Sequence, residues 1–127
     1  MVTIIAHGFC VLITHGQFNE MSNTFTIDLQ EFSTHSSEDF KTGTHGTMVR
    51  IKSGLDTMEP YSDKIIIRIP ADVISLSQAF LEELLENTIV KLREDEFLAK
   101  VQFERNGRYD ITSDLKEVIE KVLRYVS

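Results

Sequence analysis

The sequence predicts an α/β fold in which a mixed sheet of four or five strands carries three helices, and N-terminal strands precede a β-α-β-α-β-α core. Residues 1–60 carry 10 charged side chains and 14 Ser or Thr, whereas residues 61–127 carry 23 and 7. Alternating apolar residues mark the first part, and helical apolar stripes dominate the second. The first part is therefore expected to be rich in strands and the second in helices.

The chain is predicted to form one domain. Its 127 residues and mass of 14.5 kDa match the usual size of a single domain. Residues 1–40 are expected to supply strands, and residues 41–127 the alternating core. No linker is long enough to separate these two parts into domains.

Three strands are predicted before the first helix. Residues 2–6 and 9–14 are short runs rich in β-branched side chains, and a His-Gly pair after each run indicates a turn. Residues 24–32 alternate between apolar and polar side chains, which is typical of a half-buried strand. Residues 33–46 are polar and rich in Gly, Ser and Thr, which predicts a loop.

The first helix is predicted over residues 45–58. Its apolar stripe has the spacing i, i+3, i+7 and i+10 and consists of Met48, Ile51, Leu55 and Met58. Pro60 then ends the helix. Residues 64–69 are apolar on both faces, which indicates a central strand covered on two sides.

The second helix is predicted over residues 77–93, with Ser77 or Ser75 as its N-cap. Its acidic residues come early and its basic residues late, which suits the helix dipole. The acidic run at residues 94–96 is expected to be a solvated connector.

The C-terminal part is predicted to be a strand at residues 97–104 and a helix at residues 113–126, capped by Thr112 or Ser113. Strands that alternate with helices through short loops indicate parallel pairing and right-handed crossovers.

Charge and composition exclude several classes of protein. A net charge of −7 and a pI near 5.0 disfavour sequence-independent nucleic-acid binding, because phosphate neutralisation needs clustered Lys and Arg. No apolar run approaches the ~20 residues of a membrane span, and the N-terminus lacks the features of a secretory signal. The single cysteine, Cys10, cannot form an intrachain disulfide, which predicts a cytoplasmic protein.

A distinctive pattern surrounds the start of the second helix. The apolar run Ile65-Ile66-Ile67 is followed by Gln78-Ala79-Phe80, which opens the helix, and by the pair Glu82-Glu83. This order resembles the STAS-like domain family of bacteria, formerly a domain of unknown function and a distant relative of the STAS domains of anti-sigma factor antagonists. The stretch 42–50 looks like the family's helix entry, and the resemblance covers about residues 40–126.

The resemblance implies a STAS-like fold and a regulatory role. Such domains often accompany a histidine-kinase-type ATPase, so the implied partner is a protein of that kind. Ile69 and Pro70 depart from the family, which commonly has Asp-Phe there. The related antagonists open this helix with Asp-Ser-Ser and are phosphorylated on one serine, whereas this chain has Ser77-Gln78-Ala79. A phosphorylation switch of that kind is therefore not expected.

The expected function is a non-enzymatic module that binds a protein partner through the start of helix 77–93. The residues assigned to partner binding are Ser75, Ser77, Gln78, Glu82, Glu83 and Glu86. The glutamates would meet a basic partner surface, and dipole complementarity alone explains them equally well.

The alternative is a small nucleotide-binding protein or enzyme that uses the Ser/Thr/His-rich loop 33–47. His45 and Arg50 are its candidate contacts to an anion, because free N–H groups gather at a helix N-terminus. No metal, cofactor or catalytic residue is assigned, because the histidines lack the spacing of metal ligands. The sequence also leaves open a homodimer formed at an exposed strand edge.

Overall fold

The structure is a computed structural model that describes residues 2–6, 9–13, 16–34 and 39–126, with side chains from residue 17 onward. The strands are β1 (Val2–Ala6), β2 (Phe9–Ile13), β3 (Gly16–Asn19), β4 (Thr24–Asp28), β5 (Lys64–Ile69) and β6 (Val101–Arg105). The helices are η1 (Leu29–Phe32), α1 (Gly43–Ser53), α2 (Leu55–Met58), η2 (Glu59–Tyr61), α3 (Gln78–Lys100) and α4 (Thr112–Val126).

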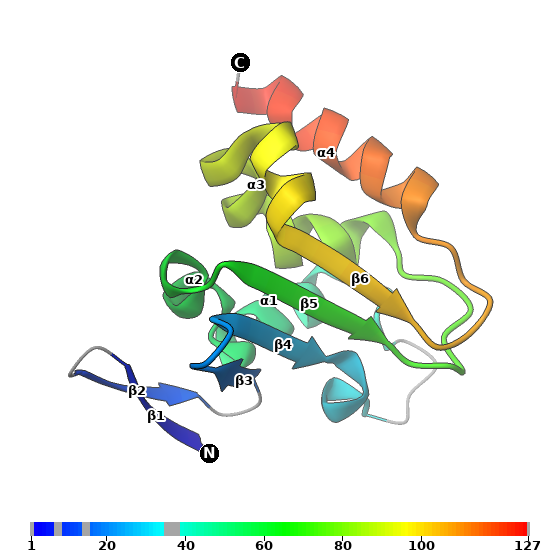
Figure 1. The fold of residues 1–127 in the computed structure, drawn as a ribbon. Coiled ribbons are helices and arrows are strands. Elements are labelled where there is room, and N and C mark those ends of the chain that lie inside the picture. The colour runs from blue at the N-terminus through cyan, green and yellow to red at the C-terminus, as the bar shows by residue number, and fades with distance from the viewer. Residues whose placement is uncertain (1, 7–8, 14–15, 35–38, 127) are drawn as a thin grey trace.

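The main sheet has four strands in the order β3-β4-β5-β6 (Figure 1). β3 is antiparallel to β4, with Phe18 opposite Phe25. β4, β5 and β6 are parallel, with Phe25 opposite Ile65 and Ile65 opposite Val101. The predicted α/β fold with a mixed sheet is therefore confirmed. β1 and β2 form a separate antiparallel pair.

The helices are layered on one face of this sheet. Each crossover, from β4 to β5 and from β5 to β6, moves one strand along in the same direction. Right-handed crossovers then place α1 and α3 on the same side. Figure 1 shows α1 behind β4 and β5, and α4 alongside α3 and beyond β6.

The other face of the sheet carries no helix within the described part of the chain. Ile66 lies on this face between Thr26 and Gln102, and it is half-buried. The prediction that residues 64–69 are covered on two sides is therefore wrong. Its physical reason is the progressive strand order, which sends both crossover helices to one side.

The core lies between the sheet and the helices. On the sheet side it contains Phe25 and Ile27 of β4 and Ile65 and Ile67 of β5, all fully buried. On the helix side, the buried residues include Val49, Phe80, Leu81, Leu84, Leu85, Ile89, Phe97, Val118 and Ile119.

The N-terminal strands differ from the predicted ones in two places. β3 was not predicted, because Phe18 is the only apolar side chain in this strand after Gly16. The sequence therefore shows no alternation of apolar and polar residues there. The strand predicted over 24–32 ends at Asp28, whose carboxylate accepts a hydrogen bond from the Gln30 amide at 3.0 Å and begins η1. Phe32 is buried from that short helix.

The predicted helix 45–58 is divided. Gly54 has φ 77° and ends α1, after which α2 begins at Leu55. The predicted stripe also does not hold within α1, where Val49 is buried and Ile51 is 68 % exposed. The helix also begins earlier than predicted, since Thr42 accepts a hydrogen bond from the His45 amide at 3.1 Å.

The helix predicted over 77–93 continues to Lys100 with a kink. Ser77 is the N-cap, as predicted, and its hydroxyl accepts a hydrogen bond from the Phe80 amide at 3.0 Å. The kink is at Arg93, whose φ is 64°. The expected connector at 94–96 and the start of the strand predicted at 97 are therefore helical, and Phe97 is buried from the second segment.

The last helix begins one residue earlier than predicted. Asp110 provides the side-chain contact at its start, since its carboxylate accepts hydrogen bonds from the amide and hydroxyl of Thr112 at 3.0 and 2.6 Å. These bonds lower the pKa of Asp110. Thr112 is thus the first residue of the helix and donates to Asp110, so the prediction that Thr112 or Ser113 caps the helix is wrong.

Candidate functional site

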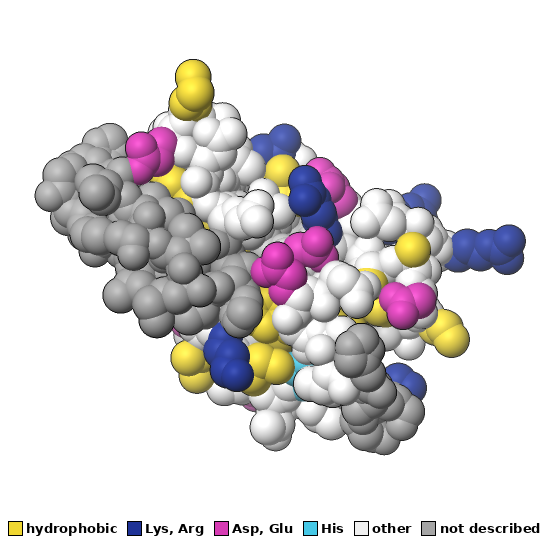
Figure 2. Space-filling model, turned by 90° about the horizontal axis from the view of Figure 1, so that it is seen from below, with side chains coloured by type: hydrophobic (Ala, Val, Ile, Leu, Met, Phe, Trp, Pro, Cys, Tyr) yellow, Lys and Arg dark blue, Asp and Glu magenta, His cyan; other side chains and the backbone are white. Residues whose placement is uncertain are grey.

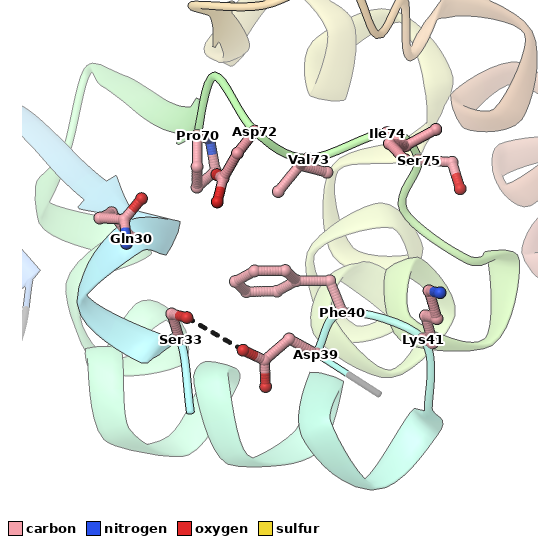
Figure 3. A pocket seen from close by; sticks show the side chains of 10 residues that line it. All are labelled: Gln30, Ser33, Asp39, Phe40, Lys41, Pro70, Asp72, Val73, Ile74 and Ser75. Atoms are coloured by element: carbon pink, nitrogen blue, oxygen red, sulfur yellow. Dashed lines mark hydrogen bonds between the residues drawn. The ribbon is translucent and has the colours of Figure 1, made fainter. Parts of the chain in front are cut away.

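The candidate site is the loop of residues 70–77, which joins β5 to α3 at the carboxyl ends of the parallel strands. Ligands of open α/β sheets bind at this end. The loop separates two hollows of about 520 and 680 Å³. The first is lined by Gln30, Ser33, Asp39, Phe40, Lys41 and residues 70 and 72–75 (Figure 3). The second lies between the loop and residues 106–109.

Phe40 forms the floor of the first hollow. Its ring lies below Pro70 and Val73 in Figure 3 and is 4 % exposed. It stacks on His45 with a centroid distance of 4.9 Å and meets Phe80 edge-on at 5.5 Å. Its φ of 63° is unusual for a residue with a side chain. These contacts hold the segment before α1 against α3.

His45 connects two other segments of the chain through hydrogen bonds from its ring. Its Nδ1 accepts a hydrogen bond from the Phe40 amide at 2.8 Å, which requires the tautomer that carries its proton on Nε2. Nε2 then donates to the Phe32 carbonyl at 3.0 Å. Both ring nitrogens therefore have partners within the chain, and contact of His45 with an anion stays a prediction.

Arg50, the other predicted anion contact, lines neither hollow. Its guanidinium lies 3.6 Å from the carboxylate of Asp56 in α2, and the Arg50 side chain is 19 % exposed. The two residues predicted to hold an anion are thus not brought together at one site.

Polar groups of the first hollow are held by local hydrogen bonds. Asp39 accepts from the Ser33 hydroxyl at 3.0 Å and from the Thr34 amide at 2.7 Å. Lys41 and Asp72 are exposed at opposite sides of the hollow (Figure 3). The lining of the first hollow therefore combines the positive charge of Lys41 with the carboxylates of Asp39 and Asp72, and it does not carry charges of a single sign.

The loop is anchored at both ends. Pro70 is buried and its carbonyl accepts from the Val73 amide at 3.2 Å. Leu76 is 2 % exposed, and the Ser77 amide donates to the Phe40 carbonyl at 3.1 Å. The loop is thereby tied to the core and to the segment before α1.

Tyr109 adds an anchor from the loop after β6. Its hydroxyl lies 2.6 Å from Asp114 and 3.4 Å from the carbonyl of Leu76. Burial, followed by the bond to Asp114, raises the pKa of Tyr109, so the phenol remains a hydrogen-bond donor at neutral pH. Gly107 passes close to the same loop, where an added Cβ would lie 2.4 Å from the Ala71 carbonyl oxygen.

Ile74 is the exposed centre of this anchored loop. Its side chain is 90 % exposed, although both ends of the loop are buried. Ser75, which was predicted to bind a partner, is also exposed next to it and lines the first hollow. The arrangement presents an apolar side chain on a backbone that is already fixed.

The predicted partner residues on α3 do not share one face. Glu82 pairs with Lys121 of α4 at 2.8 Å and raises the pKa of that lysine through their hydrogen bond. Glu83 instead accepts from the Thr47 hydroxyl of α1 at 3.2 Å. Glu86 is exposed.

Gln78, like Glu82, contacts α4. Its side-chain amide donates to Glu117 of α4. Figure 2 shows acidic and basic side chains next to one another on the side it displays. On α3, the acidic residues Glu82 and Glu83 act as contacts to the neighbouring helices α4 and α1.

The described side chains offer no metal cluster, since no three of their His, Cys, Asp and Glu residues gather. Cys10, His7, His15 and His35 lie outside the described side chains. In the part of the chain that the structure describes, no helix has the length and apolar character needed to cross a bilayer.

Comparisons with family models, with curated proteins and with solved structures give no match.

Proposed function

We propose that the protein is a non-catalytic module that binds a protein partner through the loop 70–77, with Ile74 as the central contact. The single observation that carries this proposal is a 90 % exposed apolar side chain on a loop whose ends are buried and hydrogen-bonded. A prearranged contact loses little conformational entropy on binding. Hollows on both sides of the loop leave room for the partner's side chains.

The resemblance to STAS-like domains supports the same surface. It implies docking at the start of α3, and the loop leads directly into that helix. A histidine-kinase-type ATPase is the partner that the resemblance implies, and the cytoplasm is the compartment we propose. Ser75 supplies a hydroxyl next to Ile74, whereas the Ser77 hydroxyl caps the helix.

The test uses the full chain as bait in an extract of its native cell, followed by binding measurements with the purified partner. Ile74→Asp should weaken binding by about 30-fold, since a buried interface anchor contributes roughly 2 kcal/mol or more. Met21→Asp is the matched control, because Met21 is 98 % exposed on the turn between β3 and β4. Equal affinity of the two variants would exclude this loop as the docking surface.

The comparison of Ile74→Asp with Met21→Asp tests the docking surface more directly than charge reversal on α3 does. Reversing the charges of Glu82 and Glu83 would test the contact with a basic partner surface that the sequence predicts. In the structure both residues contact neighbouring helices, so their reversal would also weaken the packing of α1 and α4 on α3.

A second candidate function is binding of a small ligand in the hollow of about 520 Å³. The observation in its favour is the position of that hollow at the carboxyl ends of β4 and β5. A thermal-shift screen with nucleotides and divalent metals distinguishes the two functions, because a ligand of the native state raises the melting temperature. A clear shift that Asp72→Asn removes would favour the small ligand.

A further inference from the structure

The β6 strand leaves an unpaired edge at one side of the sheet. β6 pairs with β5 on one side, and it is the last strand in the sheet order. The Asn106 amide donates toward β5, to the Ile69 carbonyl at 3.4 Å. Since backbone groups alternate in direction along a strand, those of Phe103 and Arg105 point away from β5. Among the residues that the structure describes, no strand pairs with these groups, so the edge can accept another strand.

An apolar groove of about 470 Å³ lies beside this edge. Leu98 of α3, Phe103 of β6 and Leu115 and Ile119 of α4 line it, and Leu98 is 50 % exposed. Because α4 lies beyond β6 (Figure 1), the helix layer extends past the sheet. An added strand would therefore pair with β6 and place alternate side chains under α4.

The overhang of α4 decides what can occupy the groove. Two copies that paired through β6 would each bring a helix layer to the same side, and helix axes need 8–10 Å of separation whereas strands need about 4.8 Å. The helices of the two copies would collide. A strand without its own helix layer is not excluded in this way.

The chain itself contains such strands. β1 and β2 form a two-stranded sheet that is separate from the main sheet. By sequence, each of their residues except Thr3 is of an apolar type. A two-stranded hairpin alone is marginally stable in water at best. Apolar strands with unpaired edges readily form hydrogen bonds with a further strand.

The hairpin cannot reach the groove of its own chain. If β2 were the strand next to β6, its end at Ile13 would lie four strand spacings, about 19 Å, from β3. The chain from Ile13 to Gly16 spans at most roughly 11 Å. Pairing of the hairpin with β6 therefore requires a second copy.

We propose that the β1–β2 hairpin of one copy adds to the β6 edge of another and packs apolar side chains into the groove between β6 and α4. This contact is heterologous, so it joins copies head to tail or closes into a ring. It is independent of the loop 70–77, which lies at the end of the sheet and not along this edge.

The test is complementation between two variants, measured by sedimentation velocity and light scattering. Leu98→Lys blocks the groove and leaves the hairpin unchanged. The double variant Ile4→Asp, Leu12→Asp introduces one charge into each strand of the hairpin and leaves the groove unchanged. Ile51→Lys is the matched control for Leu98→Lys, since Ile51 is a 68 % exposed apolar residue on α1.

The wild type and Ile51→Lys should increase in mass with concentration. Each blocked variant alone should remain at 14.5 kDa, and their equimolar mixture should reach twice that mass and no more. Circular dichroism checks that all variants are folded. A monomeric wild type, a mixture that stays monomeric, or association of Leu98→Lys alone would each overturn the proposal.

Discussion

The buried carboxylate of Glu59 connects both parts of the kinked helix to the segment before β5. Glu59 is 4 % exposed. Its carboxylate pairs with Lys91 at 2.6 Å and with Lys100, and the Lys100 ammonium also donates to the Glu59 carbonyl at 2.8 Å. The two lysines lie on either side of the kink at Arg93. The perturbation with the clearest expected effect is therefore Glu59→Gln.

The size of this effect follows from burial. Removing one partner of a fully buried pair costs about 3–5 kcal/mol. Here Lys91 is 54 % exposed and Lys100 18 % exposed, so both regain some hydration and the cost falls to about 2–3 kcal/mol. For a domain of this size the melting temperature should fall by about 8–12 °C.

The control is Glu104→Gln, which changes the net charge equally. Glu104 pairs with Arg68 at 3.0 Å, and their side chains are 48 % and 45 % exposed. An exposed pair contributes about 0–1 kcal/mol. Calorimetry or denaturant unfolding of both variants measures the difference. Equal losses would refute the argument from burial.

The same pair predicts a dependence on pH. Burial alone would raise the pKa of Glu59, but hydrogen bonds and charges from Lys100 and Lys91 outweigh it and hold the pKa below 4.5. A lowered pKa stabilises the folded state above the unfolded value, and this contribution is lost as pH falls through the folded value. The stability gap between wild type and Glu59→Gln should therefore be constant above about pH 5 and shrink toward pH 3. A gap that does not shrink would contradict the assignment.

Two further predictions concern the packing of α1. Gly46→Ala should destabilise the fold by about 2–3 kcal/mol in denaturant unfolding, because its Cβ would lie 2.3 Å from the Phe80 carbonyl oxygen. The control, Gly43→Ala, should stay within about 1 kcal/mol of wild type, because its Cβ would meet the flexible Glu83 Cγ at 3.1 Å. Equal effects of the two variants would disprove the close approach of Gly46 to Phe80. His45→Ala should lower the free energy of unfolding by about 2–4 kcal/mol and speed hydrogen exchange at the Phe40 amide, because that amide loses its acceptor. Unchanged exchange at the Phe40 amide would disprove this role of His45.

The parallel core could be predicted from the sequence because its signals are local and repeated. Residues 64–69 are bounded by Asp63 and Pro70, and Ser77 supplies a cap that needs no tertiary contact. The connection between these elements then follows from crossover handedness. These parts of the fold agree with the structure.

Other elements depend on contacts that the local sequence does not show. Phe97 suits a strand or a helix by sequence, and the structure places it, fully buried, in the second segment of α3. In α1 the face that approaches α3, marked by Gly46 next to Phe80, leaves Ile51 68 % exposed, although Ile51 fits the apolar stripe of the sequence. Ile66 is apolar but lies on the face without helices, so composition alone suggested a second covering layer.

The centre of the candidate site could not be found from periodicity. Val73, Ile74 and Leu76 are equally apolar in sequence, but Leu76 is 2 % exposed and Ile74 is 90 % exposed. The difference arises from anchors that come from distant segments, namely Phe40 before α1 and Tyr109 after β6. The two hollows likewise exist only when these segments meet at the loop.

The packing around α3 narrows the surface that remains for a partner. Glu83 is turned toward α1 and Glu82 toward α4, so the helix is contacted on two flanks at its first turns. A partner that docked on these glutamates would have to compete with Thr47 and Lys121. The loop before the helix is under no such competition, since its anchors use backbone groups and leave the Ile74 side chain outside. Specificity for the proposed partner should therefore depend mainly on the shape of this loop, with Glu86 as an exposed charge one turn beyond Glu82.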